Sequence, residues 1–221
     1  GTSSNMNANE VIANLASKNS KLNIGPNDDV NMSQSSNDVI PTAIKISAHI
    51  DLTKKLYPAL DKLINEIQTK AKSLKGVTKT GRTHLMDAMP IDFSDELLAW
   101  SSQLSACRNM LEVIEERFLE LPQGGTAVGS GINAHKQFAK FFAQEMSKIL
   151  ETKRKYIPSN NFFHELSAQD CSVQLSGELK NLAVILMKIS NDLRWMNSGP
   201  LAGLSEIELQ ALQPGSSIMP G

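Results

Sequence analysis

The sequence predicts a mainly α-helical fold, in which a bundle of long helices follows a loop-rich N-terminal segment. Three long tracts carry apolar residues at alternating spacings of three and four. This 3.5-residue repeat is typical of near-parallel helices that cross at about 20°. Asn, Asp and Ser crowd the segment before these tracts, and such side chains favour turns and helix caps. We therefore expect a loop-rich segment over residues 1–40 and a helical domain over residues 41–221.

The loop-rich segment is expected to hold one short helical stretch, near residues 9–18. The long helical tracts are expected at residues 41–75, 92–121 and 167–196. The apolar seam of the first tract is Leu56, Leu60, Leu63, Ile67 and Leu74. The seam of the second tract is Leu97, Trp100, Leu104, Cys107, Leu111, Ile114, Phe118 and Leu121. The seam of the third tract is Leu175, Leu179, Leu182, Leu186, Ile189, Leu193 and Met196. Ser167 and Asp170 have the spacing of a capping box at the start of the third tract.

Composition excludes several classes of protein. The net charge is -1 and the pI is about 6.5, so no basic surface predicts nucleic-acid binding. No apolar run approaches the roughly 18 residues of a membrane span. The two cysteines, Cys107 and Cys171, are far apart and predict neither a disulfide framework nor a metal site. A reducing, cytoplasmic location without membrane or nucleic-acid partners is therefore expected.

Three helices of this length would leave apolar seams uncovered. Each would be roughly 45 Å long, at about 30 residues and 1.5 Å per residue. We therefore expect partner subunits to complete the helical core, so that the protein is a homo-oligomer.

One candidate anion site precedes the first long helix, within residues 25–38. The N-terminus of a helix offers free N–H groups and a partial positive charge. Ser35, Ser36 and Asn37 could add side-chain donors to a carboxylate. The same residue types are favoured helix caps, so capping alone is an equal alternative.

A second candidate lies between the first two long tracts, where residues 81–90 are expected to form a loop. It contains His84, and histidine is the usual proton-transfer group near neutral pH. A lone histidine in a loop is nevertheless more often structural. His49, His135 and His164 have no companion motif and are interpreted as structural.

Three further segments are polar or rich in glycine. Gly124–Gly131 lacks the order of a phosphate-binding loop and is interpreted as a tight connection between helices. Gly215–Gly221 contains Ser216 and Ser217, and alone it resembles a flexible linker. A serine becomes a base only where N–H donors or a cation stabilise its alkoxide. Residues 1–7 alone form a polar terminus.

Together, these segments resemble the motifs of the fumarase/aspartase superfamily, in the family's order. The match is to class II fumarases, through GTSSNMNANE, PNDDVNMSQSSNDVIPTA, GRTHLMDAMP, GGTAVGSGIN, LMKISNDLRWMNSGPLAGLSEIEL and PGSSIMPG. Fumarases and argininosuccinate lyases have His after the Thr of the third motif, whereas aspartases typically have Gln. The resemblance makes residues 1–40 the end of the family's N-terminal domain and residues 41–221 its central helical domain, ending in the catalytic loop.

The resemblance implies reversible hydration of fumarate to L-malate, a step of the tricarboxylic acid cycle, without metal or redox cofactor. It makes Ser216 the base that removes the C3 proton and His84 the partner that assists water loss or addition. It assigns the substrate carboxylates to Thr2, Ser35, Ser36, Asn37, Thr83 and Ser217. It also implies a homotetramer whose sites are shared between subunits.

Some features depart from the family pattern. At the family's second anion site Asn27 and Asp28 are present, but Gly25 stands where a His is usual, so we expect this site to be weak. The chain has no initiator Met, and we interpret it as the middle of a longer protein, stopping before the lysine of the catalytic loop. By itself it is expected to be inactive.

Alternatives are another lyase of the superfamily, such as an aspartase or argininosuccinate lyase, or a non-catalytic helical scaffold. If the protein is eukaryotic, the mitochondrial matrix is an alternative location.

Overall fold

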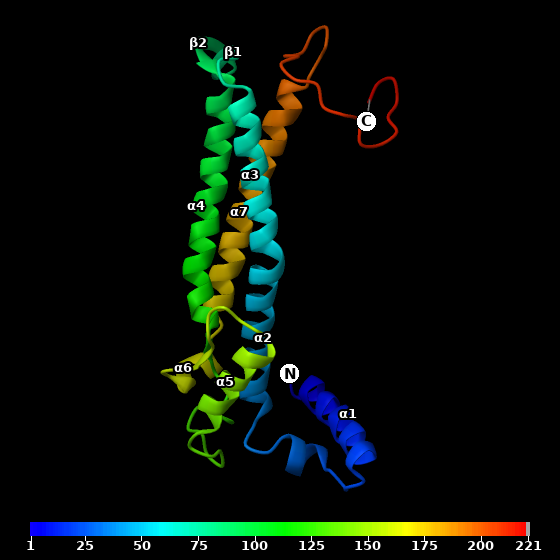
Figure 1. The fold of residues 1–221 in the computed structure, drawn as a ribbon, viewed down its shortest axis with the longest axis vertical. Coiled ribbons are helices and arrows are strands. Elements are labelled where there is room, and N and C mark those ends of the chain that lie inside the picture. Colours follow the sequence, from blue (N-terminus) through cyan, green and yellow to red (C-terminus); the bar gives the residue numbers. More distant parts are fainter. Residues whose placement is uncertain (220–221) are drawn as a thin grey trace. The chain divides into compact units, whose positions relative to one another are not determined.

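The computed structural model describes residues 1–219, and the end of the predicted catalytic loop, Pro220 and Gly221, lies outside the described residues. Helices dominate the structure, as predicted (Figure 1). The chain divides into two compact units. The N-terminal unit comprises residues 1–59 and 110–176, and the hairpin unit comprises residues 60–109 and 177–221. No helix within residues 1–219 has both the length and the apolar character that a membrane crossing requires.

Three long helices contribute to both units, namely α3 (Tyr57–Ser73), α4 (Phe93–Phe118) and α7 (Asp170–Met196). The N-terminal unit further contains α1 (Thr2–Ser20), η1 (Pro26–Val30), α2 (Ser36–Asp51), η2 (Leu52–Leu56), β3 (Glu120–Leu121), α5 (Phe138–Ile149), β4 (Ile157–Pro158) and α6 (Phe162–Ser167). The hairpin unit further contains β1 (Thr78–Thr83) and β2 (Met86–Asp92).

Helix α1 is longer than the predicted stretch at residues 9–18, since it begins at Thr2 and has 19 residues. Its first turns are rich in Asn and Ser, which have modest helix propensity. Buried amides compensate: Asn5 and Asn9 both donate to Asn31 Oδ1, at 3.3 and 3.0 Å. The prediction of a polar terminal loop was therefore wrong, because tertiary contacts override local propensity here.

Helix α2 begins at Ser36, before the predicted start at residue 41. Ser35 Oγ accepts a hydrogen bond from the N–H of Asn37 at 3.2 Å, and Asp38 Oδ1 accepts one from the N–H of Ser35 at 2.9 Å. These two bonds form a capping box, which satisfies N–H groups that the helix itself cannot. The tract then continues to Ser73 through a short π-helical turn, η2.

The seam of the second tract is confirmed in detail. Leu104 and Leu111 are completely buried, and Leu97, Trp100 and Cys107 are 5% exposed or less. On α7 the residues of the predicted seam alternate between buried and exposed positions. The periodicity of the sequence does not distinguish the two kinds of position. Its exposed members include Leu179 and Leu186, at 40% and 37% exposure.

Helix α7 begins at Asp170 rather than at Ser167. Ser167 is instead the last residue of α6, where its hydroxyl donates to the carbonyl of Phe163 at 2.7 Å. The predicted capping box was wrong, because this serine belongs to a separate short helix and bonds within it.

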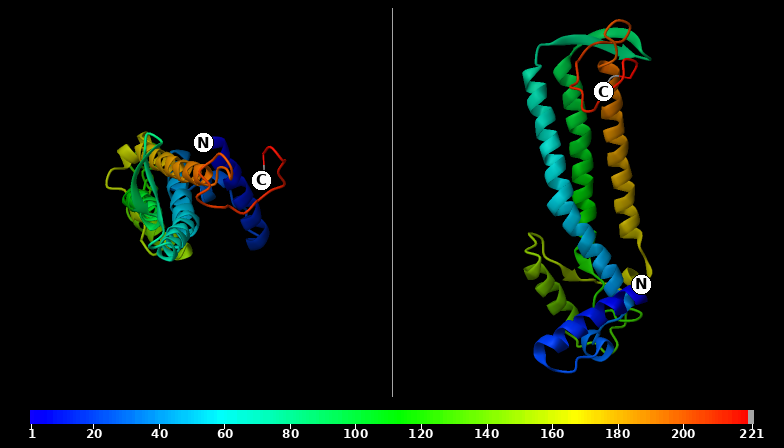
Figure 2. Two further views of the ribbon diagram at one scale, coloured as in Figure 1. Left: turned by 90° about the horizontal axis from the view of Figure 1, so that it is seen from above. Right: turned by 90° about the vertical axis from the view of Figure 1, so that its right-hand side faces the viewer.

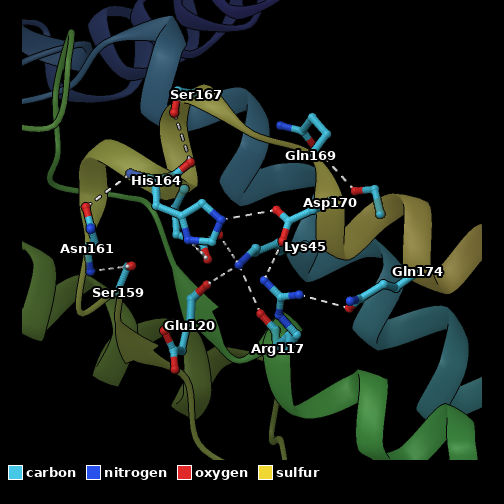
Figure 3. Close-up of polar contacts among 12 residues, drawn as sticks. Lys45, Arg117, Glu120, Ser159, Asn161, His164, Ser167, Gln169, Asp170 and Gln174 are labelled. Atoms are coloured by element: carbon cyan, nitrogen blue, oxygen red, sulfur yellow. Dashed lines mark hydrogen bonds and ion pairs between the residues drawn. The ribbon is translucent and has the colours of Figure 1, made fainter.

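The core of the N-terminal unit lies where Leu121, Ala143 and Tyr156 pack together. Beside it, the ammonium group of Lys45 is buried (Figure 3). It donates to the carbonyls of Arg117 and Glu120, at 2.9 and 2.8 Å, and forms an ion pair with Glu165. The Arg117 carbonyl belongs to the last turn of α4, so Lys45 satisfies a group that the helix end leaves unpaired.

In the hairpin unit, the segments of α3, α4 and α7 lie side by side in Figures 1 and 2. Polar contacts join them: Trp100 Nε1 donates to Asp192 at 3.1 Å, and Gln68 donates to Ser101 Oγ at 2.9 Å. The segment after α7 folds back onto the helix end, where the N–H of Glu206 donates to the carbonyl of Met196 at 2.9 Å.

Residues 81–90 are not a loop. Strands β1 and β2 form an antiparallel hairpin, in which Thr83 pairs with Met86. His84 and Leu85 form the two-residue tip, with φ of 49° and 62°. Positive φ at both positions is the geometry of a type I′ turn, which usually contains Asn and Gly. The tip lacks that sequence signal, so the hairpin could not be predicted from its turn.

Candidate functional site

The start of α2 brings several predicted substrate-binding residues together. Thr2 Oγ1 lies 3.0 Å from Ser36 Oγ, so α1 contributes its first residue to this cluster. The amide of Asn37 donates to the carbonyl of Ala127 at 2.8 Å. The hydroxyl oxygen of Ser35 accepts the capping hydrogen bond, which leaves its own hydrogen available for another acceptor.

Asp38 connects this cluster to the glycine-rich turn. Its side chain is fully buried, and its Oδ2 accepts hydrogen bonds from the N–H groups of Gly124 and Thr126, at 3.0 and 2.8 Å. Burial raises the pKa of Asp38, although these backbone hydrogen bonds partly offset the effect. No local sequence pattern predicts this contact, because its partners lie far along the chain.

The glycine-rich turn is a tight connection, as interpreted. Gly129 has φ of 110°, and a Cβ there would lie 2.7 Å from the backbone nitrogen of Phe163. A side chain therefore could not be accommodated without moving α6. The turn serves close packing of the backbone around α6.

The residues of the expected second anion site lie on η1. Asn27 donates its amide to Asp28 Oδ1 at 3.1 Å, and both residues are exposed. The neighbouring Asp29 accepts the N–H of Gly25 at 2.7 Å. Two carboxylates beside Asn27 make this surface unfavourable for an anion.

His84 occupies an exposed and strained position at the hairpin tip, directly after Thr83. Left-handed backbone is uncommon for residues other than glycine, and for a bulky residue such as Leu85 it is an outlier. Strain of this kind persists only where the surroundings enforce it, and it is concentrated at functional sites.

Ser216 lies in a tight turn near the end of the described chain, and it is exposed like its neighbour Ser217. The N–H groups of Ile218 and Met219 donate to Ser216 Oγ, at 3.3 and 2.9 Å. Its own N–H donates to the carbonyl of Met219 at 2.8 Å. Two N–H donors on one hydroxyl oxygen favour its deprotonated form.

A cluster of charged side chains lies next to the hairpin, and no sequence motif predicted it. The Glu206 carboxylate lies 2.8 Å from Lys79 Nζ and 2.7 Å from a guanidinium nitrogen of Arg82. Lys79 also forms an ion pair with Glu96. Burial opposes the charge on Lys79, but the two carboxylates raise its pKa overall. Burial likewise opposes ionisation of Glu206, but the two cations lower its pKa overall. A cleft of about 420 Å³ lies against these residues.

Two of the other histidines, His49 and His164, make side-chain contacts of the kind that a structural role requires. His49 shares a 2.7 Å hydrogen bond with the Tyr156 hydroxyl and lies 3.4 Å from Glu115, and burial lowers its pKa. His164 lies 3.2 Å from Asp170, which also binds Arg117 at 2.8 Å (Figure 3). The Arg117 guanidinium lowers the pKa of Asp170.

The predicted site residues thus divide between the two units. Thr2, Asn27, Asp28 and residues 35–37 belong to the N-terminal unit, whereas Thr83, His84, Ser216 and Ser217 belong to the hairpin unit. Among residues 1–219, no group of three or more His, Cys, Asp or Glu side chains is placed to hold a metal ion.

The structure is a bundle of long helices that carries a histidine at a strained hairpin tip. The family model described as "Lyase" matches residues 1–221, so the chain belongs to this lyase family. It is 55% identical over 221 residues to fumarate hydratase class II 2 of Pseudomonas aeruginosa and 56% identical to fumarate hydratase class II of Xylella fastidiosa.

The structural comparison agrees. The crystal structure of class II fumarase from Schistosoma mansoni matches all of this chain with a TM-score of 0.92 and 38% identity, and half of that chain is covered. The chain likewise spans about half the length of the curated relatives, 48% and 46% for the two above.

Proposed function

We propose that the protein containing this chain catalyses the reversible hydration of fumarate to L-malate. The observation that carries this proposal is the identity of more than half of the residues to class II fumarate hydratases over the whole chain. Thr83-His84 at the hairpin tip supports a fumarase over an aspartase, which typically has Gln after this Thr.

Ser216 is the proposed base in the direction of dehydration. Its alkoxide removes the C3 proton of malate, and the electron pair of that bond passes into the adjacent carboxylate as an aci-carboxylate. The two N–H groups on Ser216 Oγ support this role, because they stabilise negative charge on that oxygen. Collapse of the aci-carboxylate then forms the double bond of fumarate.

His84 is the proposed partner at the other end of the substrate. As the C2–O bond breaks, the hydroxide must receive a proton to leave as water, and an imidazole can supply it directly or through a bound water. The hairpin tip supports this role, since His84 is exposed there and can meet a small ligand.

Neutral donors are proposed to hold the two substrate carboxylates, namely Thr2, Ser35, Ser36, Asn37, Thr83 and Ser217. Neutral hydroxyl and amide groups bind a dianion without the desolvation cost of buried counter-ions. The 3.0 Å contact between Thr2 and Ser36 supports their acting on one carboxylate. At most weak anion binding is proposed at Asn27 and Asp28.

The active assembly is proposed to be a cytoplasmic homotetramer with sites shared between subunits. What supports an assembly is exposed apolar area on α7, where Val184, Met187 and Trp195 are 55%, 61% and 55% exposed. Such area is normally covered in a folded protein of this kind.

The proposal is tested by assaying the full-length protein with fumarate, aspartate and argininosuccinate. Hydration of fumarate alone is expected. Deamination of aspartate or cleavage of argininosuccinate, without malate formation, would assign the protein to another branch of the family. Failure on all three substrates would favour a non-catalytic scaffold.

A further inference from the structure

We propose that Glu206 is a positioning residue, which fastens the hairpin that carries Thr83 and His84 to the chain that leads to Ser216. This inference rests on the proposed function of His84 and Ser216. All of its contacts lie within the hairpin unit.

One carboxylate binds two cations of strand β1. Glu206 Oε2 lies 2.8 Å from Lys79 Nζ, and its Oε1 lies 2.7 Å from an Arg82 nitrogen. In a regular strand, residues three apart point to opposite faces. The pairing of β1 with β2 shifts in register between Thr80 and Arg82, and such irregularities redirect side chains. Both cations therefore reach the same carboxylate.

The backbone of Glu206 is fixed at the same time. Its N–H donates to the carbonyl of Met196, the last residue of α7, at 2.9 Å. Nearby, the N–H of Leu209 donates to Asn197 Oδ1 at 2.9 Å. Glu206 thus joins three parts, namely β1, the end of α7 and the segment that continues to Ser216.

The charges of this cluster are balanced and poorly hydrated. Lys79 and Arg82 face Glu206 and Glu96, and the side chains of Lys79 and Glu206 are 8% and 12% exposed. Removing one member of a buried ion pair leaves its partner uncompensated, which costs far more than losing an exposed pair. Glu206 therefore holds its partners in one arrangement.

The catalytic consequence follows from the place of Arg82 in the sequence. Arg82 directly precedes Thr83 and the strained tip at His84 and Leu85. Left-handed backbone at those residues needs external support, and the anchored guanidinium supplies it. A displacement of about 1 Å in a reacting group can lower the rate by roughly 100-fold.

The first test compares Glu206→Gln with Glu208→Gln in the full-length protein. Glu208 is an exposed glutamate on the same segment and serves as the matched control. For Glu206→Gln, kcat for fumarate hydration is expected to fall by roughly 10- to 100-fold, with a much smaller change in KM. Glu208→Gln is expected to stay within about twofold of the parent. Equal kcat in the two variants would overturn the proposal.

A double variant separates positioning from general stability. If Glu206 acts through His84, adding Glu206→Gln to His84→Asn should reduce kcat by a small factor. The same substitution in the parent protein should reduce kcat by a much larger factor. Full additivity of the two losses would overturn the proposal. If Glu206→Gln does not assemble, Glu206→Asp keeps the charge and allows the same comparison.

A measurement independent of activity distinguishes failure of this inference from failure of the proposed function. In Glu206→Gln, amide hydrogen exchange is expected to accelerate over residues 78–86 and 196–209, and in Glu208→Gln it is expected to remain unchanged. Unchanged exchange in Glu206→Gln would overturn the positioning role. A parent protein that does not hydrate fumarate would instead refute the proposed function, whatever the exchange shows.

Discussion

At the scale of single residues, the proposed chemistry and the stability of the fold depend on different side chains. His84 and Ser216 are exposed, and neither belongs to an apolar seam. In the full-length protein, His84→Asn and Ser216→Ala are each expected to lower kcat by about 100-fold or more, the usual contribution of a positioned acid or base. The melting temperature is expected to change little. Steady-state kinetics and thermal unfolding check this prediction, and a large drop in melting temperature would assign these residues a structural role.

Asp38, by contrast, is expected to contribute to the stability of the fold. Its carboxylate accepts N–H groups of Ser35, Gly124 and Thr126, and an asparagine would turn an amide donor toward some of them. Asp38→Asn should therefore lower the free energy of unfolding by about 2–3 kcal/mol at neutral pH. Denaturant unfolding followed by circular dichroism measures this loss. Asp51→Asn, at an exposed ion pair with Lys55, is the control and should cost less than about 0.5 kcal/mol.

Glu206 makes the stability depend on pH in a predictable direction. Its pKa is lowered in the folded protein from an ordinary value of 4.5, because Lys79 and Arg82 outweigh the effect of burial. The folded state therefore binds the proton less readily than the unfolded state, and the carboxylate stabilises the fold above pH 4.5. As the pH falls below that value, this contribution is lost.

The difference in melting temperature between the parent and Glu206→Gln should consequently be nearly full at pH 6–8, which is about 1.5 units or more above the ordinary pKa of 4.5. It should shrink as the pH falls below 4.5. Thermal unfolding over this pH range measures it, with Glu208→Gln as the reference. A constant difference across the range would contradict the assigned shift.

What could be predicted at this scale was the identity of reactive side chains, not their surroundings. His84 and Ser216 stand in motifs that can be read locally. The contacts of Glu206 with Arg82 and of Asp38 with Gly124 join residues far apart in the chain. The proposed roles of the site residues remain predictions.

At the scale of elements, periodicity was informative where one face of a helix is buried. The seam of α4 was predicted correctly because its spacing alternates without a break over many turns. The first turns of α1 and the β1–β2 hairpin were not predicted. The first depends on the amides of Asn5 and Asn9, and the second on a turn without Asn or Gly.

The α4 seam leads to a prediction about stability. Leu104 is completely buried, whereas Leu98 on the same helix is 44% exposed. Leu104→Ala should lower the free energy of unfolding by about 2–5 kcal/mol, because it removes buried methyl groups and leaves a cavity. Leu98→Ala is the matched control in the isolated subunit and should cost much less. Equal losses, measured by urea unfolding, would contradict the assigned core.

At the scale of the whole molecule, the sequence suggested a boundary near residue 40, and that boundary remains a prediction. The compact units of the structure instead combine segments that are separate in sequence, because α3, α4 and α7 each pass from one unit to the other. Hydrophobic periodicity identifies such helices but does not show where along them the packing partners change. It also could not distinguish the buried seam positions of α7 from the exposed ones.

These exposed positions carry the prediction about assembly. Leu179 and Leu186 follow the α7 seam, yet they are 40% and 37% exposed in a single chain. If partner subunits cover them, Leu179→Glu with Leu186→Glu places two charges in an apolar interface, where an unpaired charge is strongly unfavourable. The full-length variant should then sediment as smaller species than the proposed tetramer, and it should lose activity if the sites are shared between subunits as proposed. Leu186→Met keeps the apolar area and should preserve the tetramer. A tetramer of undiminished stability in the double glutamate variant would show that this face of α7 is not the interface.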